Sequence, residues 1–277
     1  MGAVRGRRML RTVGVLLLAA ALILVAAVVR PRAQDDAQGR YFQDFSDGQR
    51  TSRYHVLDGG VDRSRPVGVA FFFDGDSTGE DAWFWNPYGA QIRAMAAEVN
   101  RRNLVLVPVL SPEAEEAENP DDQITWWLRQ RDDGAWFRAL ARHLLRTEHL
   151  DASRLWLTGY SGGADFITDE ALARDSGWIR GGGATIVGGG EGDGFPTAPS
   201  AAVKGMALTW HEGTEDVPAQ DDPQGRSGTT AGRAGWRQYR DAGFTRARFQ
   251  TVPGADHGGY DVHALLEEDL EREAAGR

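Results

Sequence analysis

One serine stands between glycines in the stretch GYSGG, residues 159–163. An apolar run at 155–158 predicts a strand before it, and residues 162–174 predict a helix after it. A serine at such a junction can be held in a sharp turn that exposes its hydroxyl for attack on a carbonyl carbon. The alternative is a tight turn without chemistry, because the chain has 35 glycines and G-x-S-x-G arises by chance. The flanking elements favour Ser161 as a nucleophile.

Histidines downstream of Ser161 are the candidates for the base that a serine nucleophile needs. His257 lies in GADHGGY, a loop of small residues between a predicted strand and the last predicted helix. His211 ends another predicted strand but has no clear acidic partner, and His263 falls inside the last helix. We therefore expect His257 to be the base.

An orienting acid is expected between the nucleophile and the base, on a loop after a later strand. Asp216, in HEGTEDV, follows the predicted strand 206–210. Asp193, in GGGEGDG after the preceding strand, is the alternative, and a role for Asp216 in a turn or a helix cap is also open. The chain order Ser161, Asp216, His257 favours Asp216.

Together the stretches GYSGG, GTED and GADHGGY resemble those of α/β-hydrolases, in particular the small esterases and polyhydroxyalkanoate depolymerases without a large lid. The resemblance covers about residues 50–270. It implies a mostly parallel sheet of about eight strands flanked by helices, no cofactor, and a triad of Ser161, Asp216 and His257. It further implies cleavage of carboxylic esters through an acyl-enzyme. The alternatives are a serine peptidase or acyltransferase on the same triad, or a non-catalytic binding module at the cell surface.

The loop expected to complete the oxyanion hole departs from the pattern of this family. Its usual His-Gly start is replaced by DGDS at residues 74–77, after VGVAFFF. Backbone N–H groups can still donate, so we expect Gly162 and Asp76 to form the oxyanion hole, with Gly75 as the alternative to Asp76. An aspartate such as Asp74 beside a developing oxyanion is unfavourable unless its carboxylate points away.

Aromatic residues follow this loop in DAWFWNPYGA, residues 81–90. They could form a wall of the substrate site or pack a loop onto the sheet. A second aromatic group at 126–137 is expected to pack. The candidate substrate-binding residues are Trp83, Trp85, Tyr88 and Tyr160.

The elements that must position these residues alternate along the chain. Strands are predicted at 54–57, 67–73, 104–110, 155–158, 184–187, 206–210 and 248–252. Helices are predicted at 88–101, 123–148, 162–174, 229–242 and 260–274. This alternation predicts an α/β domain over 51–277 with a mostly parallel sheet.

The N-terminal segment, 1–33, has the pattern of an export signal. An uncharged apolar run at 13–29 follows four arginines. We expect a signal anchor or a cleavable signal peptide, then a polar spacer at 34–50. This predicts a body outside the cytoplasm, either anchored in the membrane by the N-terminal helix or secreted.

Charge and composition exclude several classes of partner. Residues 1–33 hold six arginines and no acidic residue, so the rest of the chain carries a charge of −15. Such an acidic body repels phosphate backbones, and no nucleic-acid partner is expected. The chain has no cysteine, and its acidic stretch at 74–80 lacks the spacing of a calcium loop, so no metal is expected.

Overall fold

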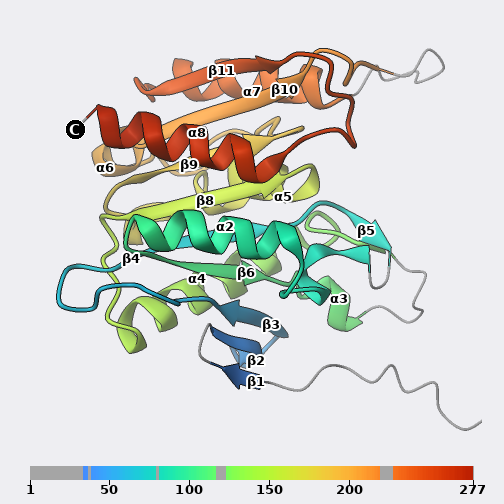
Figure 1. Ribbon diagram of the computed structural model, residues 1–277. Helices are drawn as coiled ribbons and strands as arrows, with labels where there is room; N and C mark the ends of the chain where they lie inside the picture. Colours follow the sequence, from blue (N-terminus) through green and yellow to red (C-terminus); the bar gives the residue numbers. More distant parts are fainter. Residues whose placement is uncertain (1–33, 37–38, 79–80, 117–122, 219–226, 277) are drawn as a thin grey trace, which may run out of the picture. The chain divides into compact units, whose positions relative to one another are not determined.

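The computed structural model describes residues 34–36, 39–78, 81–116, 123–218 and 227–276 (Figure 1). The apolar run predicted to be an N-terminal helix lies outside these residues. Within the described part of the chain, no helix is both long enough and apolar enough to cross a bilayer.

A mixed sheet forms the centre of the domain. Its strand order is β1-β2-β3-β6-β4-β8-β9-β10-β11, and the six strands from β6 to β11 along this order are parallel. The expectation of about eight mostly parallel strands is confirmed, with the short β1 added at one edge. The strands are β1 (Gln34–Asp36), β2 (Gly39–Ser46), β3 (Thr51–Val56), β4 (Gly68–Phe73), β6 (Leu104–Val109), β8 (Leu155–Tyr160), β9 (Gly182–Val187), β10 (Ala207–Gly213) and β11 (Ala247–Val252).

The predicted spacer at 34–50 is wrong, because β1 and β2 belong to the sheet. β2 pairs antiparallel with β3, and Tyr41 and Phe42 are buried. The remaining side chains of β2 include Gln43 and Asp44, which face solvent at least in part. A strand with one covered face near the edge of a sheet needs few apolar residues, so its composition is that of a linker.

Helices cover both faces of the sheet. α2 (Ala90–Arg101) and α8 (Val262–Ala275) lie side by side on one face, and α4 (Gln130–Thr147), α5 (Gly162–Phe166) and α7 (Gly228–Asp241) lie on the other (Figure 1). β4, β6 and β8 are buried along almost their whole length, as expected for strands covered on both faces.

Two predicted helices differ from those observed. The helix predicted at 123–148 starts only at Gln130, because Gln123–Ile124 forms β7, which pairs with β5 (Ser77–Thr78). The helix predicted at 162–174 is the short α5 followed by a π-helical turn, η3 (Ile167–Ala171). The remaining short helices are η2 (Trp83–Trp85), α3 (Glu113–Glu116), η4 (Ser176–Trp178) and α6 (Ala201–Lys204).

The parallel register brings three loops to one edge of the sheet. β8, β9, β10 and β11 are consecutive neighbours, so their carboxyl ends lie together. The loops after β8, β10 and β11 carry Ser161, Asp216 and His257. Binding and catalytic groups of open α/β sheets gather at this edge.

A fully buried carboxyl group lies just beneath this edge, on Glu212 of β10. The Gly189 N–H donates to its Oε1 over 3.4 Å, and Oε2 has no hydrogen-bond partner among the described residues. Burial, together with the nearby carboxylates of Asp216 and Asp165, raises the pKa of Glu212 to about 10. Glu212 is therefore neutral in the folded protein at pH 7 and ionised in the unfolded chain.

This protonation difference predicts that Glu212→Gln stabilises the protein at alkaline pH. Because the folded pKa lies above the unfolded one, Glu212 costs stability that grows as pH rises from about 4.5 towards 10, by at most about 1.4 kcal/mol per pH unit. Glutamine has nearly the same shape and stays neutral. We expect a gain of roughly 1–3 kcal/mol at pH 8, shrinking towards pH 5, in chemical denaturation.

Glu215→Gln is the matched control, since Glu215 lies on the same loop but is exposed. Its stability should follow wild type at both pH values. A Glu212→Gln variant that gains nothing at pH 8 relative to pH 5 would show that the buried carboxyl is ionised in the folded state.

Candidate active site

The turn between β8 and α5 holds Ser161 in a strained backbone conformation. Its φ is 51° and its ψ is −120°, a region that residues other than glycine rarely occupy. Such a conformation costs about 1–3 kcal/mol. The Ser161 N–H donates to the Val187 carbonyl over 2.9 Å, which ties the turn to the end of β9.

Two glycines let the chain turn this sharply. A Cβ on Gly159 would lie 2.4 Å from the Gly163 carbonyl oxygen, and a Cβ on Gly163 would lie 2.3 Å from the Phe73 carbonyl oxygen in β4. Neither site has room for a side chain. The glycines of GYSGG are thus required by close backbone contacts, as a sharp strand–helix turn demands.

The three residues expected to act together form a hydrogen-bonded line. Ser161 Oγ lies 2.9 Å from His257 Nε2, and His257 Nδ1 lies 2.9 Å from Asp216 Oδ2. The His257 side chain is 50% exposed, whereas that of Asp216 is 5% exposed. In this arrangement the imidazole can accept the serine proton while the carboxylate fixes its tautomer.

Asp216 receives two further hydrogen bonds. The Gly228 N–H donates to Oδ1 over 3.1 Å, and the Tyr260 hydroxyl donates to Oδ2 over 2.7 Å. Gly228 is placed there by a capping box at the start of α7, in which Ser227 and Thr230 each accept the other's backbone N–H. In the sequence, the only signal for Tyr260 is its position three residues after His257.

The loops that carry Asp216 and His257 are joined to each other. The Gly254 N–H donates to Thr214 Oγ1 over 2.8 Å, and the Glu215 N–H donates to the Ala255 carbonyl over 3.0 Å. The Tyr160 hydroxyl donates to the backbone carbonyl of His257. The half-exposed histidine thus sits on a loop that is fixed from both sides.

The rival candidates lie elsewhere. The Asp193 side chain is largely exposed and pairs with Arg174 at 3.6 Å. His211 Nε2 lies 2.9 Å from Asp269 Oδ2, in a buried pair between β10 and α8. Neither residue contacts Ser161 or His257.

The Asp74 carboxylate points away from the nucleophile. It accepts the Gly75 N–H over 2.9 Å and the Trp83 N–H over 2.5 Å, so it caps η2. Burial raises the pKa of Asp74 to about 6. The Gly75 N–H is thus engaged with Asp74, so the N–H groups of Gly162, which starts α5, and of Asp76 remain the donors expected at the turn.

The carboxylate beside the turn is instead that of Asp76. Trp127 Nε1 donates to Asp76 Oδ2 over 3.1 Å, while the buried Oδ1 has no partner among the described residues. A Cβ on Gly162 would lie 2.2 Å from this Oδ1. Burial, with the nearby carboxylates of Asp165 and Glu113, raises the pKa of Asp76 and so favours its neutral form.

The aromatic residues expected to bind substrate fall into two groups. Trp83 stacks between Phe72 and Tyr160, with ring centroids 5.8 and 6.3 Å away, so Trp83 and Tyr160 lie next to the turn. Trp85 stacks on Phe42, and Tyr88 packs against Tyr41. These last two contacts are with β2, and neither Trp85 nor Tyr88 is among the described residues that line the cavity beside Ser161, although Tyr88 is 45% exposed.

The second aromatic group, at 126–137, contains both buried and exposed residues. Trp126, Trp136 and Phe137 are buried in the core as expected. Trp127, by contrast, is 54% exposed and bonded to Asp76 beside the turn. The expectation that this whole group packs is therefore wrong for Trp127.

A cavity of about 560 Å³ opens beside Ser161 and His257. Its acidic residues are Asp165, Glu191 and Asp216, and its hydroxyl groups come from Ser161, Ser227 and Thr230. Among the described lining residues, Val217 and Ala231 are the apolar side chains, and none of the predicted aromatic residues is present. The described lining is therefore acidic and carries few apolar side chains.

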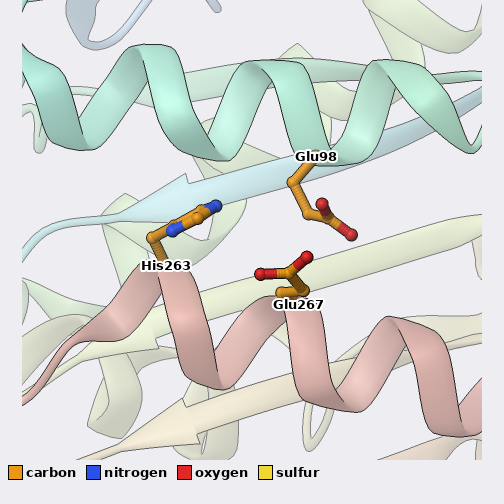
Figure 2. A group of neighbouring side chains, drawn as sticks. All are labelled: Glu98, His263 and Glu267. Atoms are coloured by element: carbon orange, nitrogen blue, oxygen red, sulfur yellow. The ribbon is translucent and has the colours of Figure 1, made fainter.

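Among the described residues, one cluster has ligand atoms suited to a metal, and none of its members lines this cavity. Figure 2 shows Glu98 of α2 facing His263 and Glu267 of α8, with one ligand atom of each within 4.8 Å of the others. Glu98 already pairs with Arg101 and Arg102, and Arg101 also pairs with Glu267. A cation would have to displace these guanidinium groups, so we assign no metal to the cluster.

Comparisons with known proteins give matches at the level of structure. No family model and no curated protein sequence matches the chain. A poly(3-hydroxybutyrate) depolymerase, LpqC from Bordetella parapertussis, superposes with a TM-score of 0.56 at 14% identity, over 89% of this chain and 92% of that one. A Bacillus cereus carboxylesterase superposes with a TM-score of 0.54 at 14% identity, over 83% of this chain and 96% of that one.

A thermostable esterase gives a TM-score of 0.53 at 17% identity, over 84% of this chain and 60% of its own length. At such low identities the likeness concerns the fold. The strand order, the sharp turn after β8 and these neighbours together show that the protein has the α/β-hydrolase fold.

Proposed function

We propose that the protein hydrolyses carboxylic esters through an acyl-enzyme formed on Ser161. The observation that carries this proposal is the hydrogen-bonded line from Ser161 through His257 to Asp216, at a strained turn where the serine is accessible. Structural neighbours named as esterases and as a depolymerase support an ester as the substrate.

The first half of the reaction acylates the serine. Ser161 Oγ attacks the ester carbonyl while His257 Nε2 takes the hydroxyl proton, and Asp216 stabilises the imidazolium. The Gly162 and Asp76 N–H groups donate to the oxyanion. His257 then gives its proton to the leaving alcohol as the C–O bond breaks.

Deacylation repeats these steps with water. His257 takes a proton from the water that attacks the acyl-enzyme and returns it to Ser161 Oγ as the carboxylic acid leaves. In both halves a negative charge develops near Asp76. Burial raises the pKa of Asp76, so protonating this carboxyl beside the oxyanion costs less than it would in water.

The cavity supports a small polar ester rather than a long acyl chain. An apolar chain needs an apolar lining, and the described lining offers two small aliphatic side chains, Val217 and Ala231. Asp165 and Glu191 give the cavity a negative potential, and no Lys or Arg is among the described lining residues. Anionic esters are therefore disfavoured.

Labelling with a fluorophosphonate tests the nucleophile. The full wild-type chain should be labelled, because fluorophosphonates react with an activated serine. Ser161→Ala should abolish labelling, and His257→Ala should slow it by about 10³-fold or more, because the base is lost. Gel fluorescence and mass spectrometry of the labelled peptide give the readout.

Ser227→Ala is the matched control, since Ser227 lines the same cavity. It loses a helix cap worth about 1 kcal/mol but should keep its labelling. Labelling that survives Ser161→Ala would place the reactive serine elsewhere, and a folded wild type that is never labelled would refute the proposed function.

A second prediction concerns substrate charge. The 4-nitrophenyl ester of hexanoic acid should be cleaved with a kcat/KM about tenfold higher than the mono-4-nitrophenyl ester of adipic acid, which replaces the terminal methyl by a carboxylate. Raising the ionic strength should narrow this ratio, because salt screens charges near the surface.

Asp165→Asn should also narrow the ratio, because it removes one charge but keeps an oxygen to accept the Gly190 and Glu191 N–H groups. Asp241→Asn changes the net charge equally at the opposite end of α7 and should leave the ratio as in wild type. Faster cleavage of the adipate ester by wild type would contradict the acidic character of the site.

A further inference from the structure

Tyr260 bridges the acid loop and the base loop through one hydroxyl group. It accepts the Gly213 N–H over 2.7 Å and donates to Asp216 Oδ2 over 2.7 Å. The same Oδ2 lies 2.9 Å from His257 Nδ1. One carboxylate oxygen is therefore shared between the tyrosine and the histidine.

The direction of the bond from Tyr260 to Asp216 follows from the partners. The hydroxyl has one proton, and it already accepts the Gly213 N–H, so its proton is directed at the carboxylate. Burial and the hydrogen bond to Asp216 raise the pKa of Tyr260 well above that of a free phenol. The hydroxyl stays protonated, and its donation to Asp216 persists over the working pH range.

Packing holds this hydroxyl in place. Tyr260 is 7% exposed, and a Cβ on Gly188 would lie 2.9 Å from its ring, so only a glycine fits beneath it. Its ring meets those of Tyr160 and His257 edge-on, with centroids 6.1 and 6.5 Å away. The donor is thus a fixed part of the loop cluster.

We propose that Tyr260 is a positioning residue that limits how strongly Asp216 stabilises the protonated form of His257. The kinetic form of this proposal rests on the proposed ester hydrolysis. Two donors on Oδ2 divide its negative charge, so the imidazolium gains less from the carboxylate than it would with Oδ2 to itself. The imidazolium formed when His257 takes the serine proton is therefore held less strongly than it would be by an undivided carboxylate oxygen.

Tyr260→Phe tests this proposal through the pH dependence of kcat/KM. Without the hydroxyl, Oδ2 acts on His257 alone and the imidazolium is better stabilised. We expect the midpoint of the acid limb to move up by about 0.5–1 pH unit, together with a lower rate at pH 6. A structural role alone would lower activity at every pH without moving the midpoint.

Tyr160→Phe is the matched control. It removes a hydroxyl from the same ring cluster, but one that is bonded to the backbone carbonyl of His257 instead of to Asp216. Its midpoint should stay within about 0.2 pH unit of wild type. A midpoint that moves equally in both variants, or in neither, overturns the proposal.

A measurement without substrate separates this proposal from the proposed function. The His257 ring, titrated by NMR in wild type and Tyr260→Phe, should show the same upward displacement of its midpoint, whether or not any ester is cleaved. An inactive protein that shows the displacement would refute the ester hydrolysis alone. An active protein without it would refute the role of Tyr260 alone.

Tyr260→Phe could fail to fold, because the Gly213 N–H loses its hydrogen-bond acceptor. A second variant tests the proposal in that case. Replacing the tyrosines with 3-fluorotyrosine in the Tyr160→Phe background keeps the hydroxyl and makes it a stronger donor. The midpoint of the acid limb of kcat/KM should then move to lower pH. An upward movement there would contradict the sharing of Oδ2.

Discussion

The backbone at Ser161 is the constraint on which the rest of the site depends. A positive φ at a residue with a side chain persists only where its surroundings hold it. Here Val187 accepts the serine N–H, and the chain on either side approaches itself and β4 too closely for any Cβ at Gly159 or Gly163. β4, β8 and β9 must therefore be packed in register before the hydroxyl reaches the edge of the sheet.

Asp216 and His257 depend on a second set of contacts, between the loops that follow β10 and β11. β10 and β11 are neighbours, and their loops exchange hydrogen bonds through Thr214, Ala255 and Tyr260. The Tyr160 hydroxyl connects this pair of loops to the turn that holds the serine. The loops that carry Ser161, Asp216 and His257 thus form one hydrogen-bonded unit, although Ser161 and His257 are 96 positions apart in the chain.

Local patterns in the sequence predicted the α/β fold and the strands of the parallel sheet. Continuous apolar runs such as 67–73 and 104–110 mark strands buried on both faces, and this signal needs no knowledge of neighbours. β2 was missed because it is only partly covered, and its burial depends on contacts with β3 that composition does not reveal.

The candidate site shows the same division between local and distant signals. GYSGG and GADHGGY are local motifs, and the structure places Ser161 and His257 within hydrogen-bond distance. The roles of Tyr260, Asp76 and Trp127 arise from contacts between distant segments. Trp127 follows the buried Trp126 directly, yet Trp126 lies in the core and Trp127 is exposed and bonded to Asp76. Sequence spacing alone does not distinguish two such neighbours.

The acidic character of the cavity has a consequence for turnover. The proposed ester cleavage would make a carboxylic acid, which loses its proton at neutral pH and becomes an anion. In that reaction Asp165 and Glu191 would tolerate the uncharged ester but repel this anion, so the same side chains would favour binding of the substrate and release of the product. Electrostatic repulsion from the cavity lining would then assist release of the acid, and the free acid would be a poor inhibitor of the proposed reaction.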